Sequence, residues 1–294
     1  MKIINISEKR LQSLEPLKLS RHVLNTESRV YHFNYQGKKK VLKILYNDKG
    51  PLFGQKFYTL EALDHYKDYL PESFLCPDTQ ISISGHVKGF SIPYFEGVNL
   101  ADLLNDKTVD EKEKIYYLAK IGEVLNQLKN IRKYSPLKEI YINDLYESNI
   151  LVNPNNKELK IIDLDSCKIL NNGSFPGRRL SKSILLEDKP HKYIYNTEDD
   201  EHGFITANEN SDLFCYNIMI LNYLYGQNIL TMTTNEFYKY LKYLESIEFN
   251  KELLNCFKKL AATCDNQNPY YLLDTITYQQ TYRAKKLVYE VNRK

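Results

Sequence analysis

Residues 141–166 read YINDLYESNILVNPNNKELKIIDLDS, and this stretch decides how the rest of the chain is interpreted. Its apolar runs NILVN and LKIID flank the polar segment PNNKE, a pattern that predicts two short strands joined by a turn. Asp144 precedes this hairpin, Asn149 stands at its first strand and Asp163 ends its second strand. We therefore expect the hairpin to hold one amide and two carboxylates close to one another.

An acid, an amide and a second acid in this arrangement suit phosphoryl transfer. That reaction needs a carboxylate to orient the attacking hydroxyl, and oxygen ligands to hold Mg²⁺ on ATP. Asp144 fits the first requirement, and Asn149 with Asp163 fits the second. Such residues seldom gather for packing alone, because acids are rarely buried without a specific role. We therefore expect ATP and Mg²⁺ as cofactors.

The length and composition restrict the class of protein. The chain has 294 residues, of which 43% are hydrophobic and 26% charged, as in one large globular domain or two smaller lobes. Its net charge of +3 is too small to indicate a nucleic-acid partner. The five cysteines match no metal or disulfide spacing, which favours free thiols in a reducing cytoplasm. Neither a signal peptide nor a membrane-spanning run is evident, so we expect a cytoplasmic protein without a membrane partner.

The first part of the chain reads as strands around one helix. Residues 29–35 and 39–45 alternate apolar and polar side chains on either side of a Gln-Gly turn, which predicts a hairpin. Residues 57–70 have helical spacing, and residues 80–95 return to the strand pattern. These segments predict a small antiparallel sheet with one helix, which ends near Gly97.

The second part is mainly helical. Residues 112–132 carry an apolar stripe that predicts a long amphipathic helix. A buried helix is expected from Asp212 to Gly226, with Ser211 or Asp212 as its N-terminal cap and the glycine as its stop. Between the hairpin and this helix, residues 171–210 read as a long irregular segment.

In this order, the elements and motifs resemble the protein-kinase-like superfamily, and the resemblance covers nearly the whole chain. The chain is similar to a divergent Ser/Thr protein kinase domain of bacterial or phage type. The resemblance implies a bilobal α+β fold, with a small antiparallel β-sheet lobe that contains one helix and a larger, mainly helical lobe. The expected lobes are residues 1–97, with a hinge at 93–97, and residues 98–294.

The resemblance also implies a role for each of five polar residues. Lys43, in the motif VLKIL, would hold the α- and β-phosphates, and Glu61 would pair with it from the helix. Asp144 would be the catalytic aspartate that orients the acceptor hydroxyl. Asn149 and Asp163 would be the Mg²⁺ ligands.

Further residues are matched to the nucleotide and to the catalytic loop. Asp212 matches the aspartate that steadies the catalytic loop from behind. The resemblance implies contact with ATP for eight residues: Asn25, Ser28, Val41, Lys43, Ile92, Pro93, Tyr94 and Phe95.

The sequence departs from the family pattern at several positions. Asn25 and Ser28 stand where glycines would approach the phosphates, and Asn143 replaces an arginine. Tyr146 stands where Ser/Thr protein kinases carry a lysine, a feature similar to choline and aminoglycoside kinases. Asp165 replaces the glycine of the D-F-G triplet, either as a further metal ligand or as a cap of the following turn.

Three functions follow from the resemblance. The first is an ATP:Mg²⁺-dependent phosphotransferase of the Ser/Thr protein kinase type, which leaves room for autophosphorylation. The second is a small-molecule kinase of the aminoglycoside or choline kinase type, favoured by Tyr146. The third is a nucleotide-binding pseudokinase that acts as an interaction module, favoured by the missing glycines. The sequence leaves the acceptor, the regulation and the oligomeric state open.

Overall fold

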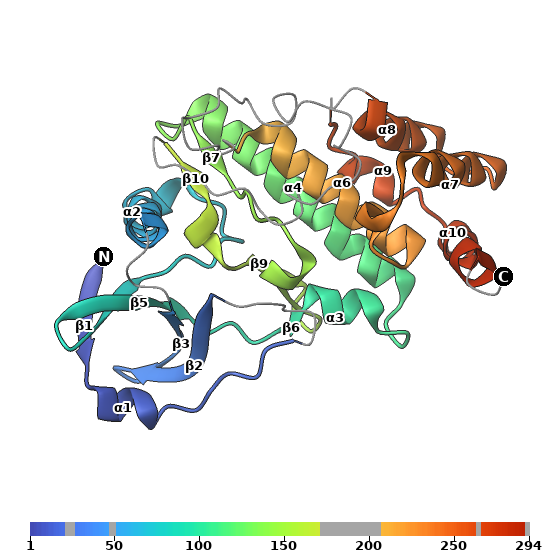
Figure 1. The fold of residues 1–294 in the computed structure, drawn as a ribbon. Coiled ribbons are helices and arrows are strands. Elements are labelled where there is room, and N and C mark those ends of the chain that lie inside the picture. Colours follow the sequence, from blue (N-terminus) through green and yellow to red (C-terminus); the bar gives the residue numbers. More distant parts are fainter. Residues whose placement is uncertain (21–26, 47–50, 171–206, 263–265, 292–294) are drawn as a thin grey trace. The chain divides into compact units, whose positions relative to one another are not determined.

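The chain forms a mixed α+β structure. The computed structural model describes residues 1–20, 27–46, 51–170, 207–262 and 266–291 (Figure 1). By their contacts, the residues divide into a first unit, Met1–Asp102 with Ser148–Asp165, and a second unit, Leu103–Glu147 with Ser166–Lys294. Most of the expected irregular segment, 171–206, lies outside the described residues.

The first unit contains most of the strands. Its elements are β1 (Lys2–Ile6), α1 (Glu8–Gln12), β2 (Ser28–Tyr35), β3 (Lys38–Leu45), α2 (Pro51–His65), η1 (Lys67–Tyr69), β4 (Thr79–Ile83), β5 (His86–Pro93), β6 (Val98–Asn99), β8 (Ile150–Asn153) and β9 (Glu158–Ile161). Strands β6, β8 and β9 form a three-stranded sheet, in which Val98 pairs with Val152. This pairing explains why the β8–β9 hairpin groups with the first unit, whereas the sequence analysis divided the chain at residue 97.

The five-stranded sheet of the first unit has the order β1-β4-β5-β3-β2. The expected antiparallel pairing holds for β2 with β3, β3 with β5 and β4 with β5. The expectation of a purely antiparallel sheet with one helix was wrong, because β1 pairs in parallel with β4 and α1 is a second helix. Strand β1 joins the sheet because Ile4 and Ile6 are buried in its core.

Apolar side chains on one face of this sheet form its core. The core residues are Ile4, Ile6, Phe33, Leu42, Ile81 and Ile83, with Leu11 and Leu14 packed against them. Leu42 lies on this face, so by the alternation of a strand its neighbours Val41 and Lys43 point to the opposite face. The core therefore determines on which side of the sheet Lys43 stands.

The two expected hairpins are confirmed. Strands β2 and β3 pair up to Tyr35 and Lys38 across a turn in which Gln36 and Gly37 both have positive φ, 50° and 75°. Strands β8 and β9 pair from Ile150↔Ile161 to Asn153↔Glu158. Local turn chemistry and strand alternation were enough to predict both.

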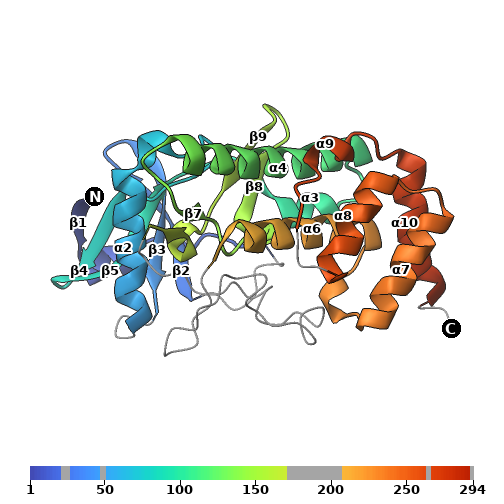
Figure 2. The ribbon, with the colours of Figure 1, turned by 90° about the horizontal axis from the view of Figure 1, so that it is seen from above.

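The second unit is built on helices. Its elements are α4 (Glu111–Tyr134), β7 (Ile140–Tyr141), β10 (Lys168–Ile169), α6 (Glu209–Tyr225), η6 (Ile229–Thr231), α7 (Thr234–Ser246), α8 (Lys251–Ala262), α9 (Tyr270–Leu273) and α10 (Tyr278–Val291). Three short elements have residues in both units: α3 (Leu100–Asn105), η2 (Glu147–Asn149) and η3 (Leu164–Ser166). Figure 2 shows α4 and α6 side by side, and the two helices are in contact. None of the helices in the described part of the chain is long and apolar enough to cross a membrane.

Helix α6 is the buried helix that the sequence predicts, but its cap differs. Asn208 is the N-terminal cap, in a capping box with Ser211, so the expectation of Ser211 or Asp212 as the cap was wrong. Gly226 ends the helix in the left-handed conformation, as expected, with φ of 81°. The side chain of Asp212 is therefore not used at the helix end.

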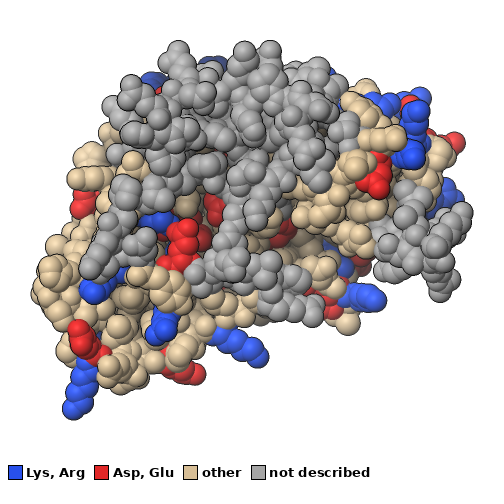
Figure 3. All heavy atoms as spheres, viewed as in Figure 1, with Lys and Arg blue, Asp and Glu red and all other residues tan. Residues whose placement is uncertain are grey.

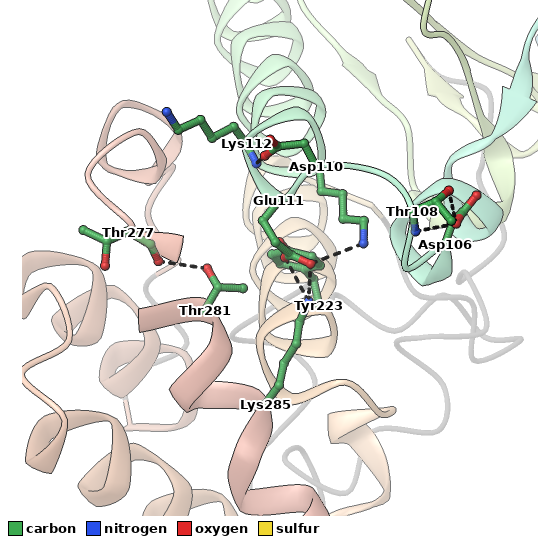
Figure 4. Close-up of polar contacts among 10 residues, drawn as sticks. Asp106, Thr108, Asp110, Glu111, Lys112, Tyr223, Thr277, Thr281 and Lys285 are labelled. Carbon is green, nitrogen blue, oxygen red and sulfur yellow. Dashed lines mark hydrogen bonds and ion pairs between the residues drawn. The ribbon is translucent and has the colours of Figure 1, made fainter. Parts of the chain in front are cut away.

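A polar cluster connects the start of α4 and the end of α6 to the middle of α10 (Figure 4). Tyr223 donates a hydrogen bond to the carboxylate of Glu111, and Lys285 donates to the same carboxylate at 3.0 Å. The ammonium group of Lys285 also lies 4.1 Å from the centre of the Tyr223 ring. Lys114 completes the cluster at 3.3 Å from Glu111. Glu111 thus links the last helix to the two central ones.

We predict that Gly122→Ala destabilises the second unit. A Cβ atom at Gly122 would lie 2.3 Å from Cβ of Tyr270 and 2.6 Å from the hydroxyl of Tyr216, so helices α4, α6 and α9 must shift to accept it. We expect a loss of about 1–3 kcal/mol in the free energy of unfolding. Urea denaturation measures it.

Gly54→Ala is the matched control, because a Cβ at Gly54 on α2 meets nothing within 4 Å. Alanine favours a helix interior, so this variant should be neutral or more stable by up to about 1 kcal/mol. Equal stability of Gly122→Ala and the wild type would show that the close packing at Gly122 is not required.

Candidate active site

The first unit brings Lys43 to the acids that follow the β8–β9 hairpin. Lys43, on β3, donates to the carboxylate of Asp163 and lies 3.1 Å from Oδ1 of Asp165. Its ammonium group is also 5.5 Å from the centre of the Phe90 ring, which belongs to its partner residue on β5. The Lys43 side chain is only 14% exposed. The fold thus joins a lysine and an acid that are 120 residues apart in the sequence.

A second lysine, Lys56 on α2, reaches the same acids. Its Nζ lies 2.9 Å from Oδ2 of Asp165 and 2.8 Å from Oε2 of Glu27. Lys56 is not recognisable as a site residue from the sequence, since a single lysine on an amphipathic helix carries no signal of its partner. The Asp165 side chain is wholly buried, and each of its oxygens accepts from one ammonium group. The sequence left two roles open for Asp165, a further metal ligand or a cap of the following turn. Neither of them includes the observed contact with Lys43 and Lys56.

The charges of this cluster shift one another's pKa. Burial alone would raise the pKa of Asp165, but Lys43 and Lys56 outweigh it and hold that pKa well below its usual range. Burial alone would lower the pKa of Lys43, but Asp163 and Asp165 raise it above its ordinary value. Burial, together with Asp165, raises the pKa of Asp163. Asp165 and the two lysines are therefore charged at neutral pH.

Asn149 lies beside Asp163 at the open end of the hairpin. The backbone N–H of Ile162, the residue before Asp163, donates to the carbonyl oxygen of Asn149 at 2.9 Å. Asp163 itself has φ of 62°, an uncommon value for a residue with a side chain. This backbone turn ends strand pairing and presents the carboxylate beside Lys43. The two expected metal ligands are thus brought to the same end of the hairpin.

Glu61 does not contact Lys43. Glu61 is exposed on α2 and accepts a hydrogen bond from Gln80 at 2.9 Å. In the described part of the chain, the acids paired with Lys43 are Asp163 and Asp165. The expected ion pair between Lys43 and Glu61 is therefore not present in this structure, because Asp165 supplies the carboxylate for Lys43.

The residues matched to ATP lie on β2, β3 and the end of β5. Val41 pairs with Ile92 across β3 and β5, and both side chains are half-buried. Ser28 begins β2 and is buried opposite Leu45. Asn25 lies outside the described residues.

Pro93 ends β5, and the chain beyond it remains close to β3. The N–H of Tyr94 donates to the carbonyl oxygen of Lys39 at 3.3 Å, and the Tyr94 side chain is exposed. Phe95 is half-buried, and a Cβ at Gly97 would lie 2.7 Å from an atom of its ring. The backbone groups of 93–95, which the resemblance matches to adenine, thus follow directly from the strand that carries Ile92.

In the second unit, Asp212 holds the backbone that precedes Asp144. Its carboxylate accepts from the N–H of Ile142 at 2.9 Å and from the N–H of Asn143 at 2.8 Å. Asn143 has φ of 64°, and its side chain donates to the carbonyl oxygen of Ser166 at 3.1 Å. The prediction that Asp212 steadies this loop from behind is confirmed. Asp144 itself is half-buried at the end of this constrained segment.

The surface of the described residues carries both signs of charge. On the face drawn in Figure 3, basic and acidic side chains are interspersed. Within the described ranges, no group of three or more His, Cys, Asp and Glu side chains is arranged to hold a metal ion. Asn149 and Asp163, the two expected metal ligands, lie at the same end of the hairpin.

Comparison with known proteins adds no family to these observations. No protein-family model matches the chain, and no curated protein matches it significantly.

We predict that Asp212→Asn lowers stability and removes a pH dependence. Burial raises the pKa of Asp212 to about 6, although two N–H donors oppose this shift. The folded state therefore binds a proton more tightly than the unfolded chain, so this residue's contribution to stability decreases as pH rises from about 4 to about 6. Asparagine cannot titrate, and its amide would turn a donor towards one of the two N–H groups. We expect a loss of about 1–3 kcal/mol in the free energy of unfolding.

Urea denaturation at pH 4.5 and at pH 7 measures this effect, as the difference between the wild type and the variant at each pH. The difference should be larger at pH 4.5. Asp274→Asn is the matched control, because Asp274 is exposed in the same unit. A difference that is the same at both pH values would contradict the raised pKa of Asp212.

Proposed function

We propose that the chain is an MgATP-dependent phosphotransferase with a bilobal, protein-kinase-like fold. The observation that carries the proposal is the contact of Lys43 with Asp163 in the first unit. The family resemblance matches Lys43 to the phosphates and Asp163 to the metal. A lysine and an acid with these two tasks must lie side by side, because the metal and the phosphates they hold are bonded to each other.

The donor set of the hairpin fits Mg²⁺. This cation prefers oxygen ligands and takes few of them from the protein, with water and phosphate oxygens completing its shell. Asp163 offers a carboxylate and Asn149 an amide oxygen at the same end of β8 and β9. Bound Mg²⁺ would neutralise phosphate charge in the reaction. Asp163 would hold the cation, and Lys43 would bind the phosphate oxygens beside it.

The loop at Asp144 supports a catalytic role for this aspartate. Asp212 accepts hydrogen bonds from the backbone N–H groups of the two residues that precede Asp144, and one of these, Asn143, adopts a positive φ. Strained backbone that the surroundings hold in place is frequent at functional sites. Asp144 would accept a hydrogen bond from the acceptor hydroxyl and orient it for attack. The hydrogen bonds to Asp212 would keep the carboxylate of Asp144 in position during this step.

The acceptor we propose first is a serine or threonine of a protein. The buried helix α6, with Asp212 holding the catalytic loop, supports this choice, because the same arrangement is the one matched to protein kinases. A small alcohol is the second candidate. Tyr146 favours it, since this residue replaces the lysine that Ser/Thr protein kinases place near the γ-phosphate.

We predict that Asp163→Ala abolishes phosphate transfer from MgATP. The variant lacks the carboxylate that would hold the cation, so the rate should fall by about a hundredfold or more. Incubation of the full chain with γ-labelled ATP and Mg²⁺ measures the transfer. Asp274→Ala is the control, because it removes an exposed carboxylate of the second unit. Unchanged turnover in Asp163→Ala would refute the proposed site.

The acceptor class is tested in the same assay. We expect label on the chain itself or on an added generic protein substrate. Label that appears only on added amino alcohols or aminoglycosides would identify the second candidate instead. Binding of MgATP without transfer to any acceptor would show that the chain binds the nucleotide but does not catalyse the reaction.

A further inference from the structure

We propose that Lys56 is a second phosphate-binding lysine, and that Asp165 is the residue that positions both Lys56 and Lys43. This inference rests on the proposed function, because it names how the same site holds the phosphates of MgATP. It adds one residue that sequence analysis missed, and it replaces Glu61 by Asp165 as the partner of Lys43.

The geometry around Asp165 carries this inference. Its two carboxylate oxygens lie 3.1 Å from Nζ of Lys43 and 2.9 Å from Nζ of Lys56. The Asp165 side chain is wholly buried, whereas the two lysine side chains are 14% and 12% exposed. A buried carboxylate that is bonded at both oxygens cannot easily change partner. The two ammonium groups are therefore held as a pair at the same place.

The other contacts of the two lysines are with groups that can be replaced. Asp163 accepts from Lys43, but this acid would take the Mg²⁺ ion when MgATP binds. Glu27 accepts from Lys56, and its side chain is 71% exposed. An exposed ion pair contributes little, so a polyphosphate can compete for that ammonium group. Each lysine would thus exchange one carboxylate for phosphate oxygens and keep Asp165.

The position of Glu27 places Lys56 at the phosphate end of the sheet. Glu27 directly precedes Ser28, the first residue of β2 and one of those matched to the phosphates. Its carbonyl oxygen accepts from the N–H of Tyr46, which follows β3. Lys56 therefore reaches the end of the strand pair that carries Lys43, where both ammonium groups bond to the carboxylate of Asp165.

A second lysine at the phosphates would compensate for the glycine-rich loop that this chain lacks. Glycine-rich loops let backbone N–H groups approach the phosphates, and this chain has Asn25 and Ser28 at those positions. A lysine binds phosphate as a point charge and needs no such close approach of the backbone. Lys56 would supply from α2 part of the attraction that the loop does not provide.

We predict that Lys56→Met weakens the binding of MgATP by about tenfold or more, since a charge-assisted hydrogen bond is lost. Adenosine has no phosphates, so its affinity should not change. Isothermal titration of the full chain with MgATP and with adenosine measures both. Lys43→Met should weaken MgATP binding as well. Lys67→Met is the matched control, because Lys67 is exposed in η1 of the same unit. Lys56→Arg should keep most of the affinity.

The outcomes separate this inference from the proposed function. A wild-type chain that does not bind MgATP would refute both. If Lys43→Met loses affinity while Lys56→Met binds MgATP like Lys67→Met, the inference fails and the proposed function stands. If Lys56→Met loses affinity for adenosine as much as for MgATP, the effect is structural and the inference also fails.

The positioning role of Asp165 is tested by the binding of MgATP. Asp165→Asn removes the carboxylate that both ammonium groups share, so the affinity for MgATP should fall several-fold while the affinity for adenosine stays unchanged. Isothermal titration of the full chain measures both. Glu61→Gln should have a smaller effect on MgATP binding, because Glu61 bonds to Gln80. An equal or larger effect of Glu61→Gln would overturn the assignment of Asp165.

Discussion

The buried carboxylate of Asp165 organises the first unit. It follows β9 by a few residues, and it bonds to Lys43 from β3 and to Lys56 from α2. Burying a single ionised carboxylate would cost several kcal/mol, but two ammonium groups at hydrogen-bonding distance offset that cost. Replacing Asp165 by a neutral residue would remove the one acceptor that both ammonium groups share. Strand β3, helix α2 and the segment after the hairpin are therefore held together by one electrostatic contact.

Backbone strain marks both segments that carry the candidate catalytic acids. Asn143, just before Asp144, and Asp163 both have φ near +60°. Neither residue is glycine, so each conformation costs free energy that the surrounding contacts must offset. Asp212 does this for the first segment by accepting two N–H groups, and Lys43 does it for the second by pairing with the Asp163 carboxylate. In both segments, a polar contact with a residue far away in the sequence stabilises a backbone conformation that the local sequence does not favour.

The local features of the fold could be predicted from the sequence. The β2–β3 and β8–β9 hairpins, helix α4 and the stop of α6 at Gly226 all follow from periodicity and turn residues. Strand β1 could not, because its five residues are placed only by parallel pairing with β4, which lies more than 70 residues later. The cap of α6 was misplaced by a few residues, since Asn208, Ser211 and Asp212 are all good caps and only tertiary contacts show which one the loop uses.

The identity of the candidate site residues came from the sequence, whereas their partners came from the tertiary structure. Asp144, Asn149 and Asp163 are recognisable because their spacing along a hairpin is a local property of the chain. The replacement of Glu61 by Asp165 as the partner of Lys43, and the presence of Lys56, were not recognisable in this way. Several acidic residues of the chain could in principle pair with Lys43, and the sequence does not show which of them lies nearest to it in space. Only the packing of α2, β3 and the hairpin end decides which carboxylate is buried between two lysines.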